Sequence, residues 1–206
     1  MHPFFTEIEK YPELKKECRT ELTKLPEPYI GKDKLSAILL GADPTNNGIP
    51  GDIGLKELDY VFGLNNENYQ KWFFRPQMTN LKSIGLQKDN LYIQNICRNY
   101  FENQTSKNKN WSKIAKIWVK YLNEELKSLP HEIPVLITAL KIMKVLVENI
   151  PPAEDIYNNP IKFLPLYSQT LQRNIYPLYR NPKYFLSKKY PDYKIFLTEK
   201  FVNPRS

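Results

Sequence analysis

The residue best suited to chemistry is Asp43, the single acid in the segment 36–51 (SAILLGADPTNNGIPG). Residues 37–40 form a short apolar run that stops at Gly41, a pattern typical of a buried strand. In α/β sheets, ligands bind beside the loops at the carboxyl ends of strands, which makes Asp43 a candidate functional carboxylate. The alternative is that Asp43 and Pro44 merely begin a turn, as Asp-Pro often does.

Asp43 needs a framework of strands to hold it, and the chain contains further segments of that kind. Short apolar runs predict four strands, over residues 35–40, 91–97, 134–138 and 174–178. Strands that alternate with helices are typical of a parallel sheet with helices on both faces. We therefore expect an α/β fold, a three-layer α/β/α sandwich around a central four-stranded, mainly parallel sheet.

Three segments have helical features. Residues 111–126 place apolar side chains on one helical stripe, interrupted only by Glu125. A second helix is expected over about residues 139–149, because two prolines follow it directly. Residues 7–24 predict one or two helices divided at Pro12.

The composition restricts the classes of protein and of site. With 206 residues and no linker or repeat, we expect one domain over residues 1–206, with residues 1–34 as a helical extension packed on it. Two histidines and two cysteines, Cys18 and Cys97, argue against a zinc site and a Ser-His-Asp triad. We expect reduced thiols, no metal and no cofactor. No long apolar run or leader is present, so we expect a cytoplasmic monomer with no membrane partner.

The charge balance predicts the kind of partner. The formal net charge is +8, spread along the chain, and 13% of the residues are aromatic. This combination is typical of folded proteins that meet a polyanion such as nucleic acid.

Motifs at three predicted strand ends occur in a recognisable order. Residues 41–51 (GADPTNNGIPG) contain Gly-x-Asp-Pro before a glycine- and proline-rich turn, and residues 91–95 (LYIQN) form an apolar strand ending in asparagine. Residues 179–182 (YRNP) follow the last predicted strand. Together with the helices and strand between them, these segments resemble the uracil-DNA glycosylase superfamily. The resemblance spans about residues 35–190, and it implies a DNA glycosylase acting on a base flipped out of DNA.

The chain departs from most members of that superfamily at three positions. Thr45 stands where many members carry a tyrosine that excludes the thymine methyl group. Asn181 replaces the usual histidine of the second signature, and Lys183 replaces a serine. The cysteine ligands of the iron–sulfur branch are absent. The resemblance therefore implies an outlying branch that acts on uracil or a related modified pyrimidine.

The resemblance also implies roles for individual residues. Asp43 would stabilise the positively charged sugar and orient the attacking water, while Asn181 would donate a hydrogen bond to the departing base. Asn95 offers both a donor and an acceptor to the edge of uracil, and Phe62 is the candidate stacking ring. The implied substrate-binding residues are Gly41, Ala42, Pro44, Thr45, Phe62, Asn95 and Pro182.

The base must leave the duplex before it can react, and an apolar wedge fills the vacated stack. The candidate wedge is Tyr184, Phe185 and Leu186, directly after the second signature. The candidate phosphate contacts are Arg180, Lys183, Lys188 and Lys189.

Other interpretations stay open for both the residues and the function. Asn95 could satisfy backbone groups at a strand end, Asn181-Pro182 could form an ordinary turn, and Phe62 could belong to the core. The alternative function is a weakly active or inactive homologue that binds damaged or single-stranded DNA. A nucleotide-binding or small-molecule enzyme is disfavoured, because neither Gly-x-Gly-x-x-Gly nor a phosphate-loop motif occurs.

Overall fold

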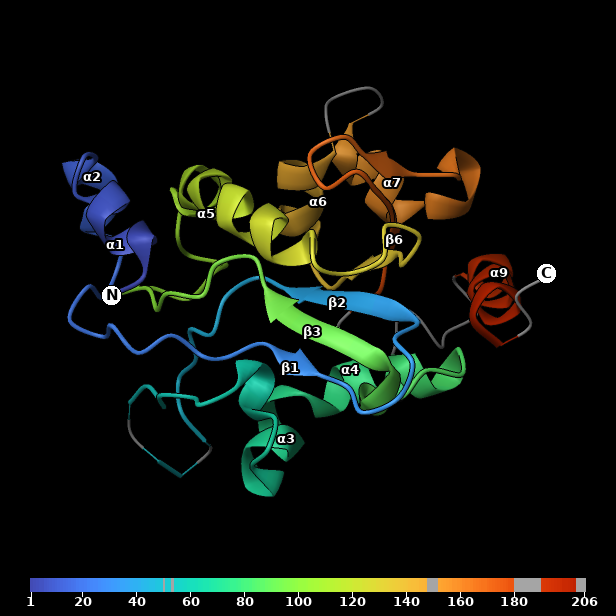
Figure 1. Cartoon of the computed structure of the whole chain (residues 1–206), viewed down its shortest axis with the longest axis horizontal. Coiled ribbons are helices and arrows are strands. Elements are labelled where there is room, and N and C mark those ends of the chain that lie inside the picture. Colours follow the sequence, from blue (N-terminus) through green and yellow to red (C-terminus); the bar gives the residue numbers. More distant parts are fainter. Residues whose placement is uncertain (50, 53, 148–151, 180–189, 203–206) are drawn as a thin grey trace.

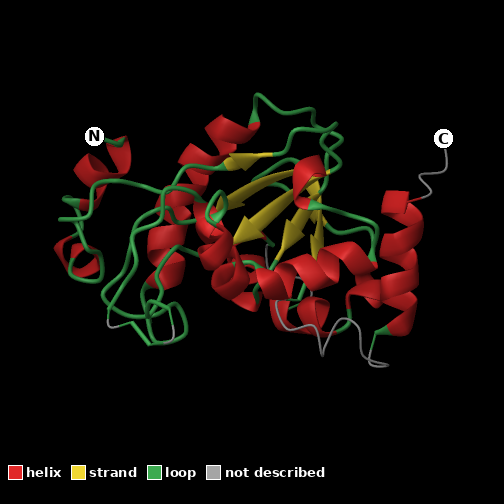
Figure 2. Cartoon of the chain, turned by 90° about the horizontal axis from the view of Figure 1, so that it is seen from below, coloured by secondary structure: helices red, strands yellow, loops and turns green. Residues whose placement is uncertain are grey.

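The computed structural model describes residues 1–49, 51–52, 54–147, 152–179 and 190–202 (Figure 1). Within these ranges, the chain forms one mixed six-stranded sheet with helices on both of its faces (Figure 2). The predicted α/β class is confirmed. None of the described helices is both long and apolar enough to cross a membrane.

The sheet has a parallel centre and antiparallel edges. Its strands follow the order β1-β3-β2-β4-β6-β5. The four central strands pair in parallel, whereas the two outer strands pair antiparallel with their neighbours. The prediction of four strands missed the edges, because a two-residue strand is too short to show an alternating pattern. The strands are β1 (Tyr29–Ile30), β2 (Ala37–Gly41), β3 (Leu91–Asn95), β4 (Val135–Ile137), β5 (Tyr167–Ser168) and β6 (Arg173–Pro177).

The helices lie mainly between the strands in sequence. The α-helices are α1 (Pro3–Ile8), α2 (Pro12–Lys15), α3 (Glu67–Phe73), α4 (Arg75–Ser83), α5 (Trp111–Leu126), α6 (Leu140–Leu146), α7 (Ala153–Asn158) and α9 (Pro191–Val202). Short 3-10 helices are η1 (Val61–Gly63), η2 (Lys88–Asn90) and η3 (Pro160–Phe163).

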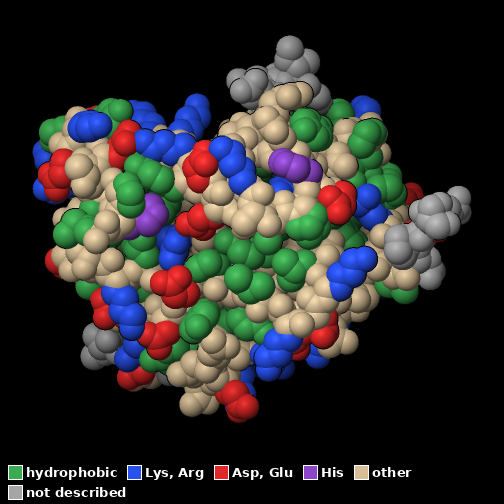
Figure 3. All heavy atoms as spheres, in the orientation of Figure 1, with side chains coloured by type: hydrophobic (Ala, Val, Ile, Leu, Met, Phe, Trp, Pro, Cys, Tyr) green, Lys and Arg blue, Asp and Glu red, His purple; other side chains and the backbone are tan. Residues whose placement is uncertain are grey.

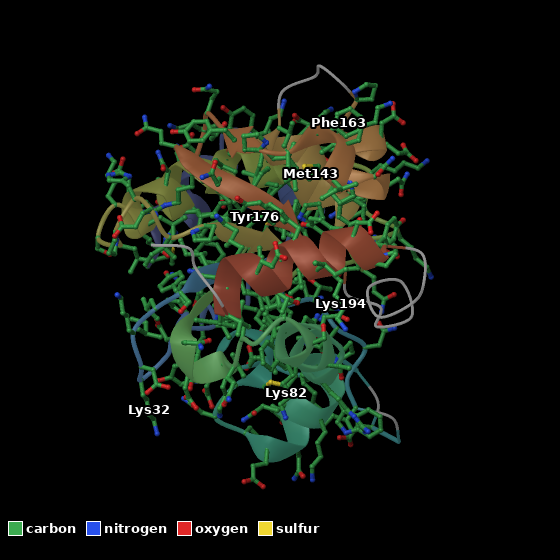
Figure 4. All side chains as sticks on the ribbon, turned by 90° about the vertical axis from the view of Figure 1, so that its right-hand side faces the viewer. Lys32, Lys82, Met143, Phe163, Tyr176 and Lys194 are labelled. Atoms are coloured by element: carbon green, nitrogen blue, oxygen red, sulfur yellow. The ribbon has the colours of Figure 1, made fainter. Side chains whose placement is uncertain are left out.

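Alternating side chains of β2 enter two separate cores. Ile38 and Leu40 pack with α5, α6 and the N-terminal α1 on one face of the sheet. Ala37 and Leu39 pack on the other face with residues of α4 and α9. Because both faces are covered, β2 is buried at every position, which explains its continuous apolar run. Figure 4 shows α9 beside Tyr176 of β6, and the Tyr176 ring lies 5.9 Å from that of Phe196.

The three predicted helical segments agree with the structure to different extents. The helix over residues 111–126 is confirmed with its predicted bounds. The helix expected over 139–149 ends at Leu146, and its last predicted turn lies partly outside the described residues. The prediction for residues 7–24 was right about the break at Pro12 but wrong beyond Lys15, since residues 16–24 form no helix.

Residues 16–24 are held by contacts with the loop after β3 instead. The backbone of Cys18 forms an isolated antiparallel β-bridge with that of Phe101. The Arg19 backbone N–H donates to the carbonyl of Tyr100 at 3.0 Å. At the start of the chain, the Phe4 ring stacks on Trp118 of α5 at 4.4 Å. The N-terminal extension therefore packs directly on the sheet domain.

Candidate functional site

A pocket of about 440 Å³ lies at the carboxyl ends of β2, β3 and β4. This is the edge of a parallel sheet at which ligands bind, because the loops there diverge and leave a hollow. Six of the residues proposed from the sequence line this pocket together. They are Ala42, Asp43, Pro44, Thr45, Phe62 and Asn95.

Two parts of the pocket come from different elements. The floor of the pocket consists of three residues that lie at or just after the ends of β2, β3 and β4. They are Asp43, Asn95 and Thr138. We call Trp72, Phe73 and Gln77, which come from α3 and α4, the rim. Phe62 in η1 lines the pocket as well. In Figure 1, α3 and α4 lie on the face of the sheet opposite α5 and α6.

The Asp43 carboxylate is fixed by three hydrogen bonds. The backbone N–H of Thr45 donates to Oδ1 at 3.0 Å. Thr105 Oγ1 donates to Oδ2 at 2.6 Å, and Trp111 Nε1 donates to the same oxygen at 2.8 Å. The donors come from three segments, so the carboxylate keeps one orientation. From the described residues, Oδ1 receives the single bond from the Thr45 backbone N–H, and it retains an acceptor site for a further ligand.

Two opposing effects act on the proton affinity of Asp43. Burial raises the pKa of its carboxyl group above the ordinary value, because a buried charge loses its hydration. Hydrogen bonds from Thr105, Thr45 and Trp111 act in the opposite direction, since they stabilise the ionised form. Burial prevails. A carboxylate with a raised pKa in a pocket is suited to orient water and to accept a proton.

Asn95 presents an unused hydrogen-bond acceptor. It is the last residue of β3 and pairs in register with Gly41 of β2. Asn95 is 2% exposed, and its Oδ1 has no hydrogen-bond partner among the residues that the structure describes. A buried polar atom without a partner costs about 1–3 kcal/mol, which makes Asn95 a candidate for binding a ligand in the pocket.

Gly41 makes room for Asn95 and for Phe62. A Cβ atom at position 41 would lie 2.3 Å from Asn95 Oδ1 and 2.4 Å from Phe62 Cζ. Both side chains therefore depend on the missing side chain of Gly41. Although the sequence assigns Gly41 to the site, it does not line the pocket and acts from beneath it.

Phe62 adopts an unusual backbone conformation for a non-glycine residue. Its φ is 55° and its ψ is 16°, in the left-handed region. This conformation is sparsely populated by bulky residues and concentrates at ligand sites. The ring lies near Gly41 and Asn95, with its centroid 5.6 Å from that of Phe74. Phe62 thus combines pocket lining with core packing, and its role as a stacking ring stays a prediction.

Thr45 and Asn46 shape the loop after Asp43. Thr45 Oγ1 accepts a hydrogen bond from the Phe101 backbone N–H at 2.8 Å. The Asn46 side chain binds the backbone of Pro44, Gly48 and Lys56 through four hydrogen bonds. Both polar residues therefore stabilise the loop that carries Asp43 while lining the pocket.

Lys141 stabilises the loop after β3, which contains Thr105. Its Nζ donates to the carbonyls of Thr105 and of Asn108, the latter at 3.0 Å. Burial lowers the pKa of Lys141, and the negative charge of Asp43 opposes that shift. Lys141 thereby fixes Thr105, which in turn donates to Asp43.

The second signature falls outside the described residues. The residues concerned are Arg180, Asn181, Pro182, Lys183, Tyr184 and Phe185, together with Leu186, Lys188 and Lys189. The described chain leaves β6 at Pro177 and continues to Tyr179. The Leu178 backbone N–H donates to the carbonyl of Ile137 at 2.7 Å, so the chain leaves the sheet beside β4.

Sequence reasoning missed several residues of the pocket. Nothing in the spacing of Trp72, Phe73 and Gln77 points to a strand end. Thr105 lies in the loop after β3, and nothing in the sequence selects it from its polar neighbours. Trp111 was assigned to the apolar stripe of its helix, which is correct for its ring, but its indole N–H binds Asp43. A polar atom on an otherwise buried tryptophan is the signal that such a contact is needed.

Metal ligands and reactive thiols do not gather at this pocket. Within the described ranges, no three His, Cys, Asp or Glu side chains are arranged to hold a metal ion. Cys18 and Cys97 are buried free thiols. Burial raises the pKa of Cys18 to about 12 and that of Cys97 well above its ordinary value. Neither thiol is activated as a nucleophile.

Comparison with known proteins gives no further assignment. No protein-family model matches the chain, and no curated protein matches it.

Proposed function

We propose that this chain is a DNA glycosylase that hydrolyses the N-glycosidic bond of uracil, or of a related modified pyrimidine, flipped out of DNA. The main support for this proposal is that Asp43, Asn95 and Phe62 line one pocket of about 440 Å³. That volume lies within the range of small-ligand sites, about 300–1,000 Å³. A carboxylate, an unpaired amide oxygen and an aromatic ring are the groups that this reaction uses.

The reaction needs stabilisation of two charges that develop together. As the bond between C1′ and the base nitrogen breaks, its electron pair leaves with the base and the sugar becomes positively charged. Asp43 stabilises the sugar and orients a water molecule through Oδ1. Water adds to C1′ as hydroxide, and its proton passes through the carboxylate to the base. The products are a free base and an abasic sugar.

Recognition of the base is assigned to Asn95 and Phe62. Asn95 Oδ1 has no partner among the described residues and would accept the N3–H of uracil. The amide nitrogen of the same side chain would donate to the O4 atom. The Phe62 ring supplies a stacking surface beside this amide. A pyrimidine thus satisfies the polar atom that the free protein leaves unpaired.

The proposal also includes the superfamily, the residues that complete the site and the residues that contact DNA. An outlying member of the uracil-DNA glycosylase superfamily is expected to have a three-layer fold, and the four parallel central strands support this. Asn181 and Pro182 would complete the site, and the segment from Arg180 to Phe185 would contact DNA. The net charge of +8 favours a DNA partner. On the face seen in Figure 3, basic side chains are interspersed with acidic ones, so this face is not proposed as the DNA surface.

The proposal is tested by measuring base release from a panel of oligonucleotides. The panel carries uracil, a thymine mismatch, hypoxanthine or an oxidised pyrimidine, in single and double strands. We expect release of uracil or a related pyrimidine, with formation of an alkali-labile abasic site. Absence of release from every substrate at enzyme excess would contradict the glycosylase proposal.

The same panel separates the alternative function. A homologue that only binds damaged or single-stranded DNA would retain the oligonucleotide in a salt-sensitive complex and release no base. Release of an abasic product would eliminate this alternative.

A further inference from the structure

Trp72 is an exposed aromatic residue on the rim of the pocket. Its side chain is 48% exposed although it lines the pocket. The chain contains three tryptophans, and the other two, Trp111 and Trp118, are buried in the core. A large aromatic surface left in water beside a pocket is characteristic of a binding site.

The surroundings of Trp72 carry positive charge. Lys71 precedes it, and Arg75 begins the next helix; both are exposed. These two residues and Lys82 border a groove of about 400 Å³ along α3 and α4, whose lining includes one acid, Glu67. Figure 4 labels Lys82 on α4. Within the described part of the chain, none of the three cations forms an ion pair.

Exposed aromatic rings and unpaired cations are the two components of sites for single-stranded nucleic acid. The ring stacks on a base, and the cations follow the phosphates. Phe62 is not equivalent to Trp72, because Phe62 packs against Gly41 and Phe74 and is partly buried, whereas Trp72 is exposed. The rim therefore offers a second stacking surface, distinct from the one assigned to the target base.

We propose that Trp72 stacks on a nucleobase next to the pocket, with Lys71 and Arg75 contacting the adjoining phosphates. The ligand is a single-stranded segment of nucleic acid. This inference rests on the proposed function in one respect, that the pocket receives a base from such a strand. It does not require that the base be excised.

The three tryptophans make a direct test available. The probe is an unmodified oligothymidylate, which contains no base expected to be released. Binding should quench the tryptophan emission of the wild-type protein, because stacking involves its one exposed indole. Trp72→Phe retains Trp111 and Trp118 and should lose most of the quenching. Trp72→Leu should weaken binding about tenfold.

A matched variant distinguishes stacking from a general surface effect. Tyr167 of β5 is also 48% exposed but does not line the pocket. Tyr167→Leu should retain the wild-type affinity and quenching. Thermal melting of each variant establishes that it is folded.

The outcomes separate this inference from the glycosylase proposal. Quenching that persists in Trp72→Phe, or an affinity unchanged in Trp72→Leu, overturns the role of Trp72. Quenching by oligothymidylate without base release from the modified panel would sustain Trp72 and contradict the glycosylase. A wild-type protein that binds no oligonucleotide at all would overturn both.

Discussion

The floor and the rim of the pocket are built by different kinds of structure. Asp43 and Asn95 on the floor are tied to paired parallel strands, and their positions follow from the strand register. Trp72 on the rim belongs to α3, which contacts η1 and α4, and Gln77 belongs to α4, which packs on one face of the sheet. The floor is held by strand pairing and by the hydrogen bonds to Asp43, whereas the rim is held by packing between short helices. Changes on the floor should therefore affect the reaction, and changes on the rim should affect binding.

Among the variants that leave Asp43 and its hydrogen bonds in place, the largest effect is expected from Gly41→Ala, which disturbs two pocket side chains at once. The added Cβ would displace the ends of the Asn95 and Phe62 side chains, both within 2.4 Å of it, without meeting the strand backbone as closely. Because displacement of a positioned group by about 1 Å can cost about 100-fold, kcat/KM for base release should fall by that order. Steady-state kinetics measure this, with thermal melting to establish that the variant folds. An unchanged kcat/KM would show that neither side chain needs its present position.

Asn95→Leu should change stability and activity in opposite directions. Leucine has a similar size and removes the unpaired Oδ1, so the free energy of unfolding should rise by about 1 kcal/mol. Loss of the amide should lower kcat/KM by about 100-fold. Urea unfolding and base-release kinetics measure the two effects. Lower stability with retained activity would indicate that Asn95 serves the strand end instead of the ligand.

Thr105→Val should change the pH dependence of the reaction. In the proposed mechanism Asp43 acts in its ionised form, so activity should fall as the pH falls through its raised pKa. Removing the Thr105 hydroxyl takes away a bond that favours the ionised form, and the acidic limb should move to higher pH. At a pH on the acidic limb of the wild type, we expect about a tenfold lower rate, corresponding to the loss of one charged hydrogen bond.

Thr138→Val is the control for this pH experiment. The Thr138 hydroxyl donates to the Leu40 carbonyl at 3.0 Å and does not bond to Asp43. The acidic limb of this variant should coincide with that of the wild type. A limb that moves equally in both variants would contradict a specific role of Thr105.

The smallest effect is expected from Phe73→Leu on the rim. Phe73 lines the pocket and contacts Tyr69, with the ring centroids 6.0 Å apart. Leucine keeps an apolar side chain, so KM should rise about threefold while kcat stays unchanged. Saturation kinetics separate the two constants. A fall in kcat with constant KM would remove the distinction between floor and rim.

Two of the three floor residues, Asp43 and Asn95, could be placed at strand ends from the sequence, because their signals are local, whereas Thr138 was not proposed for the site. An apolar run that breaks at Gly41 marks the end of one strand, and the run ending in Asn95 marks the next. Parallel pairing then brings the two ends together without further information. Glu125, the exception on an apolar helix stripe, is explained by its bonds with Arg98 and Gln94.

The rim could not be predicted, because its place depends on contacts between distant segments. Trp72 reaches the pocket through the packing of α3 on η1 and α4, and α4 in turn packs on the sheet. The same reason applies to Trp111, whose apolar ring was predicted but whose bond to Asp43 was not. The edge strands escaped prediction because two residues show no period. The resemblance to the glycosylase superfamily stays a prediction.

The most direct test of the central claim is a single-turnover measurement of base release by wild type and Asp43→Asn. The substrate is a single-stranded oligonucleotide with one uracil, mixed with excess enzyme, and the free base is quantified by mass spectrometry. We predict that the wild type releases uracil and that Asp43→Asn, which is nearly isosteric, does so at least about 100-fold more slowly. Equal rates for the two proteins, or no release by the wild type, would contradict the role of the Asp43 carboxylate.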